Sequence, residues 1–197
     1  MALTCGQITK GLVAAVCGKA PSSGTGAKVY LLNYADIDRA SCTVKNGVIS
    51  SLVMLSGKYA YEFESMPKST LGEATFARGT YFNTFDHAVT LRVFTKNAES
   101  KAFMSNLANS RIVAIVENAD TGVDGEVKYE VYGWDSGLTL SELSFSTTYS
   151  DSTVYAAKMA SEDESKEGAL PLSFFDTDIA TTESALAALL PDTLGSK

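Results

Sequence analysis

Two side chains of this sequence have the types needed for nucleophilic catalysis. His87 is the only histidine of the chain, and Cys42 is one of three cysteines. A thiol next to an imidazole is the usual pairing of a cysteine nucleophile with its general base. No local signature accompanies Cys42, and His87 shares one face of a predicted strand with Val89 and Leu91. We therefore interpret His87 as a core or edge histidine bonded to backbone, and we predict that the protein is not an enzyme.

Two other segments have residue types that bind metal ions or phosphate. Asp120, Asp124 and Glu126 offer carboxylates, but their spacing is not that of an EF-hand loop. The glycines of 24–28 precede a predicted strand and lack the spacing of a phosphate-binding loop. We interpret these segments as a solvated turn and a flexible hinge, and the acidic segment 162–167 as a solvated loop. No metal site and no cofactor are predicted.

The composition indicates a folded acidic protein. Among the 197 residues, 45% are hydrophobic and 20% are charged, which is enough apolar material for a packed core. The net charge of −7 disfavours non-specific nucleic-acid binding, because that binding depends on neutralising phosphates. The odd, sparse cysteines predict no disulfide framework and a reducing compartment. No signal peptide is expected, because the longest apolar run near the start, at 12–17, is too short. No membrane span is expected, because no apolar run approaches about 20 residues.

Alternating apolar and polar residues predict a chain dominated by strands. The sequence Asn46-Gly47 between two apolar segments is a strong signal for a hairpin. The segment 67–81 contains a proline and two glycines and is interpreted as a long loop or an irregular extended excursion. The predicted strands lie at 28–34, 41–44, 48–55, 59–64, 82–96, 111–117, 152–159 and 170–175.

Three segments have helical patterns. The clearest is 97–109, where Asn97 can cap the first turn and Phe103 and Leu107 form an apolar pair. A short C-terminal helix is expected at 181–190, and another short helix is possible at 4–17.

The segment 125–145 is predicted to be two strands joined at Asp135-Ser136-Gly137. One face of the first strand should seal the core, and the opposite face should meet a neighbour or a lumen. In the second strand the apolar residues change parity, so we expect a bulge near Ser141–Glu142, or a strand covered on both faces. The core face would hold Val127, Tyr129 and Val131, and the outward face Lys128, Glu130, Tyr132 and Trp134.

These patterns predict a mainly β fold, a β-sandwich or barrel with one packed mid-chain α-helix, an N-terminal arm and a short C-terminal helix. The expected organisation is an arm at 1–27, a β-sandwich domain at 28–161 and a C-terminal extension at 162–197.

The layout resembles a tail tube protein of a tailed bacteriophage, whose tube fold is shared with contractile injection systems. The resemblance lies in the strand–helix–strand unit 82–117, in the hairpin Tyr129-Glu-Val-Tyr-Gly-Trp-Asp-Ser-Gly-Leu138, and in the excursion 67–81 combined with terminal arms. It is a resemblance of layout, without a diagnostic motif.

The resemblance implies a virion structural protein that associates with itself. Six copies would form a ring, and rings would stack into a hollow tube that conducts DNA during ejection. The other partners would be virion tail proteins, with synthesis in the host cytoplasm and DNA only as passing cargo. Expected lumen-facing acids are Glu62, Glu64, Glu130 and Glu142, and expected interface residues are Pro67, Leu71, Phe76, Tyr81, Tyr132 and Trp134.

Two other classes remain open from the sequence. The first is a different virion protein, such as a capsid, decoration or head–tail connector subunit. The second is a non-viral β-sandwich binding module or an unrecognised hydrolase.

Overall fold

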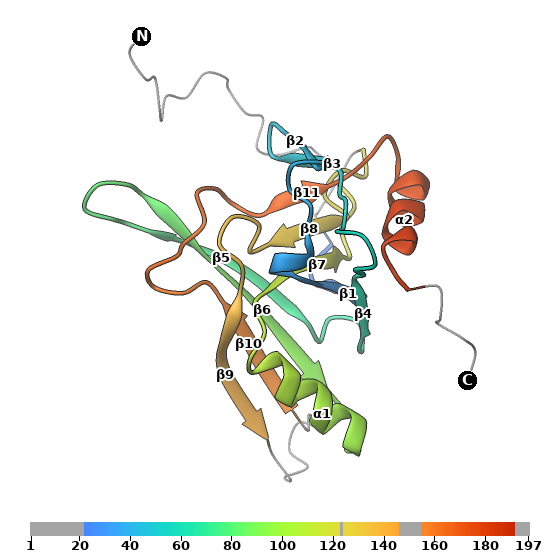
Figure 1. Ribbon diagram of the computed structural model, residues 1–197, viewed down its shortest axis with the longest axis vertical. Helices are drawn as coiled ribbons and strands as arrows, with labels where there is room; N and C mark the ends of the chain where they lie inside the picture. Colours follow the sequence, from blue (N-terminus) through green and yellow to red (C-terminus); the bar gives the residue numbers. More distant parts are fainter. Residues whose placement is uncertain (1–21, 123, 146–154, 192–197) are drawn as a thin grey trace.

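The computed structural model describes residues 22–122, 124–145 and 155–191. In these residues the protein is mainly β, with two sheets and two α-helices (Figure 1), as the sequence predicts. The expected helix at 4–17 and the start of the expected strand at 152 lie outside the described residues. The strands are β1 Thr25–Asn33, β2 Thr43–Lys45, β3 Val48–Ser51, β4 Tyr61–Glu64, β5 Leu71–Ala77, β6 Thr84–Val93, β7 Ile112–Asn118, β8 Tyr129–Tyr132, β9 Thr139–Phe145, β10 Tyr155–Ala160 and β11 Leu172–Phe174, and the helices are α1 Ala98–Leu107 and α2 Ile179–Ala188, with a 3-10 turn at Tyr34–Asp36.

The larger sheet has seven strands in the order β2-β3-β11-β8-β7-β1-β4. Its pairs are antiparallel except for β3 with β11, which run parallel. The first five residues of β7 are all buried, because this strand lies inside the sheet and both of its faces are covered. The continuous apolar run at 112–116 is the pattern expected of such a strand.

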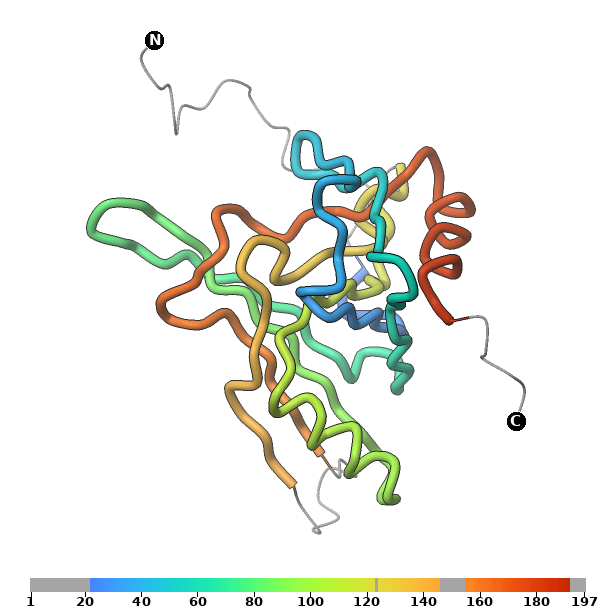
Figure 2. The backbone as a smooth tube through the Cα atoms, in the orientation of Figure 1, coloured from blue at the N-terminus to red at the C-terminus, as the bar shows by residue number. Residues whose placement is uncertain are grey.

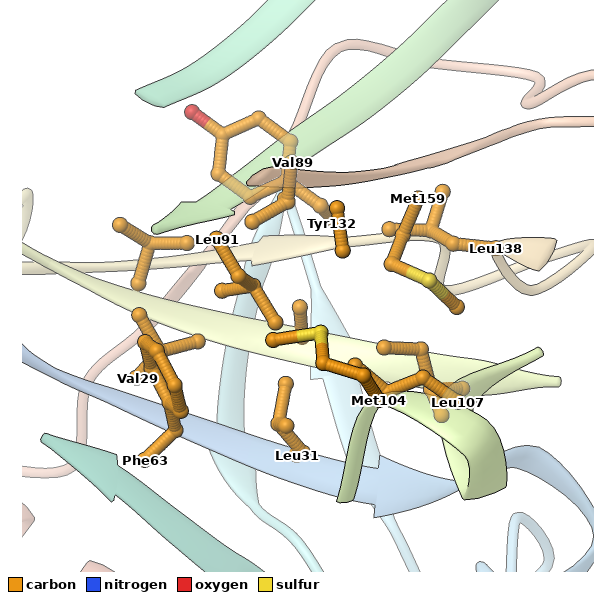
Figure 3. Packing of buried hydrophobic residues seen from close by; sticks show 14 of the residues in the cluster. Val29, Leu31, Phe63, Val89, Leu91, Met104, Leu107, Tyr132, Leu138 and Met159 are labelled. Carbon is orange, nitrogen blue, oxygen red and sulfur yellow. The ribbon is translucent and has the colours of Figure 1, made fainter. Parts of the chain in front are cut away.

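The smaller sheet has four strands in the order β5-β6-β10-β9. In β6 the buried residues His87, Val89 and Leu91 alternate with half-buried ones, so one face of this sheet points to the interior. That face packs against β1 and β7 of the larger sheet, and α1 contributes Met104 to the same core (Figure 3).

A second core covers the opposite face of the seven-stranded sheet. It includes Ile115 of β7, Phe174 of β11 and Leu186 of α2, all almost fully buried. The larger sheet is therefore buried on both faces, whereas the smaller sheet is buried on one.

The local turn and capping signals predicted from the sequence are confirmed. Asn46 and Gly47 adopt φ values of 53° and 82° between β2 and β3. Asn97 caps α1, since its side chain accepts a hydrogen bond from the Ser100 N–H at 2.7 Å. The last helix begins two residues before the predicted start, because Asp178 caps it through the Thr181 N–H at 2.7 Å.

The expected hairpin at 125–145 is wrong. β8 pairs with β7 and β11 in the larger sheet, whereas β9 pairs with β10 in the smaller one. The chain changes sheets in the turn between Gly133 and Leu138. The expected bulge is confirmed: Lys158 pairs with Glu142 and Met159 with Leu140, which leaves Ser141 as the extra residue.

The segment after residue 161 is part of the sandwich and not an extension of it. β11 lies between β3 and β8 in the larger sheet, and α2 covers the second core. The excursion at 67–81 is also more regular than expected. Its strand β5 pairs with β6 along seven residues, and the two form a hairpin that projects from the molecule (Figure 2).

Candidate self-association surface

The outer face of the four-stranded sheet consists of small and polar side chains, with Leu71 as an exposed apolar residue among them. The strand pairings place Leu71, Thr90, Lys158 and Glu142 in one row across this face. The neighbouring rows add three acidic or basic residues and several small ones. Neither α1 nor α2 covers this face, because each of them packs on one of the two cores. The remaining outward residues with register partners are Glu73, Thr75, Ala77, Thr84, Asp86, Ala88, Arg92, Thr139, Ser144, Ala156 and Ala160.

The same sheet has two edges that pair with one strand only in the part of the chain that the structure describes. β5 pairs with β6, and β9 pairs with β10. β9 ends in Leu143 and Phe145, which are about half exposed although they share the parity of the inner face. Exposed edges that carry apolar side chains favour pairing with another chain.

The tip of the β5–β6 hairpin is the most exposed aromatic feature among the described residues. The exposed fractions are 60% for Phe76, 89% for Tyr81 and 82% for Phe82. Arg78 lies between them and is also exposed. A group of aromatic residues and an arginine at a surface is typical of a protein contact site.

Of the expected interface residues, four are at the surface and two are not. Pro67, Leu71, Phe76 and Tyr81 are exposed, although no partner chain tests their role. Tyr132 and Trp134 are only 5% and 8% exposed, so the expectation that they contact a neighbour is wrong. β8 lies inside the seven-stranded sheet, and each of its faces meets one of the two cores.

Phe82 was not among the expected residues, although the sequence contains a signal for it. Tyr81 and Phe82 are adjacent and follow Gly79-Thr80, so they cannot both face one core from a strand. The alternation of β6 begins only after them.

The expected lumen-facing acids do not share one surface. Only Glu142 lies on the outer face of the four-stranded sheet. Glu62 and Glu64 belong to β4, an edge strand of the other sheet, and Glu62 forms a 3.1 Å ion pair with Lys28. The Glu130 carboxylate accepts a hydrogen bond from the Tyr132 hydroxyl at 2.9 Å. The sequence alternation identifies polar positions but not the sheet to which each strand belongs.

A buried polar cluster holds the turn where the chain changes sheets. The Glu167 carboxylate accepts hydrogen bonds from the Asp135 N–H at 2.7 Å, the Ser136 N–H at 2.9 Å and the Ser136 hydroxyl at 2.6 Å. Glu167 is almost fully buried, so its expected place in a solvated loop is wrong. The strand alternation could not reveal this burial, because the donors are 31 and 32 residues away.

His87 belongs to the same region, and its ring nitrogens make hydrogen bonds to backbone groups only, as predicted. Its Nδ1 accepts from the Gly133 N–H at 3.3 Å, and its Nε2 lies 3.0 Å from the Ala169 carbonyl oxygen. Both ring nitrogens are therefore occupied, with the proton assigned to Nε2. The Cys42 thiol contacts the Asp38 carbonyl instead. The geometry gives no nucleophile–base pair between these two residues.

The acidic turn near residue 120 also has a local structural role. Asp120 accepts hydrogen bonds from the N–H groups of Gly122 and Ser22, at 2.9 and 3.1 Å. Among the described residues, no group of three histidines, cysteines or acids is placed to hold a metal ion.

Burial lowers the pKa of His87 below 6.5, although nearby Glu167, Asp135 and Asp86 oppose this shift. Because the unfolded chain then binds the proton more readily, the stability contributed by neutral His87 is present above pH 6.5 and decreases as the pH falls below it. We expect the imidazole resonances of this single histidine, followed by NMR, to titrate with a midpoint below pH 6.5. A midpoint at or above 6.5 would contradict the buried neutral state.

Comparisons with protein-family models, with curated proteins and with solved structures give no match to this chain. Within the ranges described by the structure, no helix has the length and apolar character needed to cross a membrane. The functional proposal therefore depends on the geometry of the sheets, their edges and the hairpin.

Proposed function

We propose that this protein is a virion structural subunit of a hollow bacteriophage tail tube, in which six copies form a ring and rings stack. The observation that carries the proposal is the four-stranded sheet, which has a solvated outer face and two edges that are unpaired among the described residues. If β5 of one subunit pairs with β9 of the next, the sheet continues around the ring and each edge is closed. A repeated head-to-tail contact of this kind can close into a ring.

The outer face of the same sheet suits the wall of a water-filled channel. Closed barrels with many strands leave an aqueous lumen, unlike small barrels that side chains fill. The carboxylates of Glu73, Asp86 and Glu142 lie on this face, accompanied by Arg92 and Lys158. Lys166 forms a 2.8 Å ion pair with Asp86, so the acids and bases of this face nearly balance. A wall without an excess of cations, in a chain of net charge −7, would release few counterions from passing DNA and would hold it weakly. The tube would join other tail proteins at its ends, in particles assembled in the host cytoplasm.

Hydrogen–deuterium exchange at low and high protein concentration tests the edge pairing. We expect the amides of β5 and β9 to exchange at least about tenfold more slowly in the associated state, because they then donate to a neighbouring strand. β2, which is an edge strand of the other sheet, serves as the control and should be unchanged. Association without protection of β5 and β9 would overturn the pairing, and a small closed oligomer would favour a decoration protein.

A further inference from the structure

A groove runs between the edge strand β4 and helix α1. One part of about 530 Å³ is lined by residues of β4, the end of β6 and the start of α1. A second part of about 380 Å³ continues along β4 toward the end of α1. Phe103 and Glu62 line both parts, and the Phe103 ring stacks on Phe63 with 5.7 Å between the ring centroids. The groove therefore has an aromatic floor.

The rim of this groove is acidic. Glu62, Glu64 and Glu99 line it, and Arg92 is the only lysine or arginine among the lining residues. The Arg92 guanidinium donates to the Ser69 carbonyl, and Glu62 pairs with Lys28. Glu64 and Glu99 are exposed and make no ion pair within the described part of the chain. The groove can therefore accept an aromatic segment that carries a cation.

The tip of the β5–β6 hairpin has these properties. Tyr81 and Phe82 are almost fully exposed, and Arg78 is the only charged residue in the segment 78–83. Phe76 packs edge-to-face on Phe85, with centroids 5.9 Å apart, so the base of the tip is held in place by the hairpin itself. Because Phe76 is already packed before binding, the base of the tip loses little conformational freedom when the tip enters a pocket.

The hairpin tip lies on the far side of the molecule from α1 and β4 (Figures 1 and 2), whose residues line the groove, so that the tip cannot reach the groove of its own subunit. We propose that the β5–β6 tip of one copy docks into the β4–α1 groove of a second copy, with Tyr81 and Phe82 on the Phe103 floor and Arg78 at the acidic rim. The contact is head-to-tail, and each subunit offers both halves of it. The inference rests on the proposed self-assembly and adds a specific contact to it.

Site-directed cross-linking tests this contact. In a background where Cys5, Cys17 and Cys42 are replaced by serine, a Thr80→Cys variant is mixed with an Asn106→Cys variant and oxidised. Asn106 is exposed and lines the groove beside Phe103, and its replacement leaves the acidic rim intact. We expect disulfide-linked heterodimers in at least tenfold higher yield than with a Thr43→Cys partner, since Thr43 lies on the distant strand β2. Arg78→Glu in the tip variant should lower the yield several-fold. Equal yields with both partners would overturn the docking.

A failure of the docking contact can be distinguished from a failure of the tube proposal. Rings without the Thr80–Asn106 cross-link would support the tube and rule out the docking contact. Cross-linked pairs or open chains that never form rings would support the docking and contradict the tube. To detect misfolding, each cysteine variant is checked for unaltered thermal unfolding under reducing conditions before it is mixed.

Discussion

Glu167→Ala should lower the free energy of unfolding by about 3–5 kcal/mol, because it removes the acceptor of three hydrogen bonds in a buried site. The Asp135 and Ser136 N–H groups would then lack their partner. Each buried unpaired donor costs about 1–3 kcal/mol, and water entering the vacated space recovers part of that sum. Urea denaturation monitored by the fluorescence of Trp134 measures the change directly.

Two further variants show whether the loss of stability comes from the Glu167 carboxylate or from any change in its segment. Glu167→Gln retains one acceptor oxygen but turns an amide N–H₂ toward a donor, so its stability should lie between those of the parent and Glu167→Ala. Glu164→Ala, in an exposed position of the same segment, should change the stability by no more than about 0.5 kcal/mol. If Glu167→Ala loses less than about 1 kcal/mol, the carboxylate does not hold the turn.

The double variant Tyr81→Ser/Phe82→Ser should weaken self-association at least about 100-fold and leave the fold intact. Aromatic anchors at the centre of an interface contribute about 2 kcal/mol each or more, and 1.4 kcal/mol corresponds to a factor of ten. The two side chains are 89% and 82% exposed in the single subunit, so that their removal leaves the cores unchanged. Sedimentation velocity over a concentration series gives the association constant.

The matched control for this prediction is Val44→Ser/Leu55→Ser. Both residues are exposed apolar side chains, but Val44 belongs to β2 and Leu55 follows β3, so neither is part of the hairpin. This variant removes apolar surface without touching the hairpin and should associate like the parent. Unchanged association of the Tyr81→Ser/Phe82→Ser variant would mean that the tip is not an interface.

Local signals predicted much of the fold. Four features depend only on neighbouring residues and are predicted correctly from the sequence. They are the alternation in 84–93, the apolar run of β7, the Asn46-Gly47 turn and the Asn97 cap. The parity change near Ser141 likewise identified the bulge, because it is a property of one strand.

Partners distant in sequence could not be predicted in the same way. The alternation correctly predicts that β8 and β9 are strands. It does not show to which sheet each strand belongs, and the prediction that the two form one hairpin is therefore wrong. The burial of Trp134 depends on the second core, to which α2 contributes from about 50 residues further along the chain. The burial of Glu167 depends on donors in the turn that changes sheets.

Negative-stain electron microscopy of the purified protein over a wide concentration range tests the central claim most directly. The account predicts six-fold rings with an open bore, and stacks of such rings at high concentration. The Tyr81→Ser/Phe82→Ser variant, viewed beside the parent, should give fewer rings or none. Compact single subunits of the parent at every concentration, or closed particles without a bore, would contradict the account.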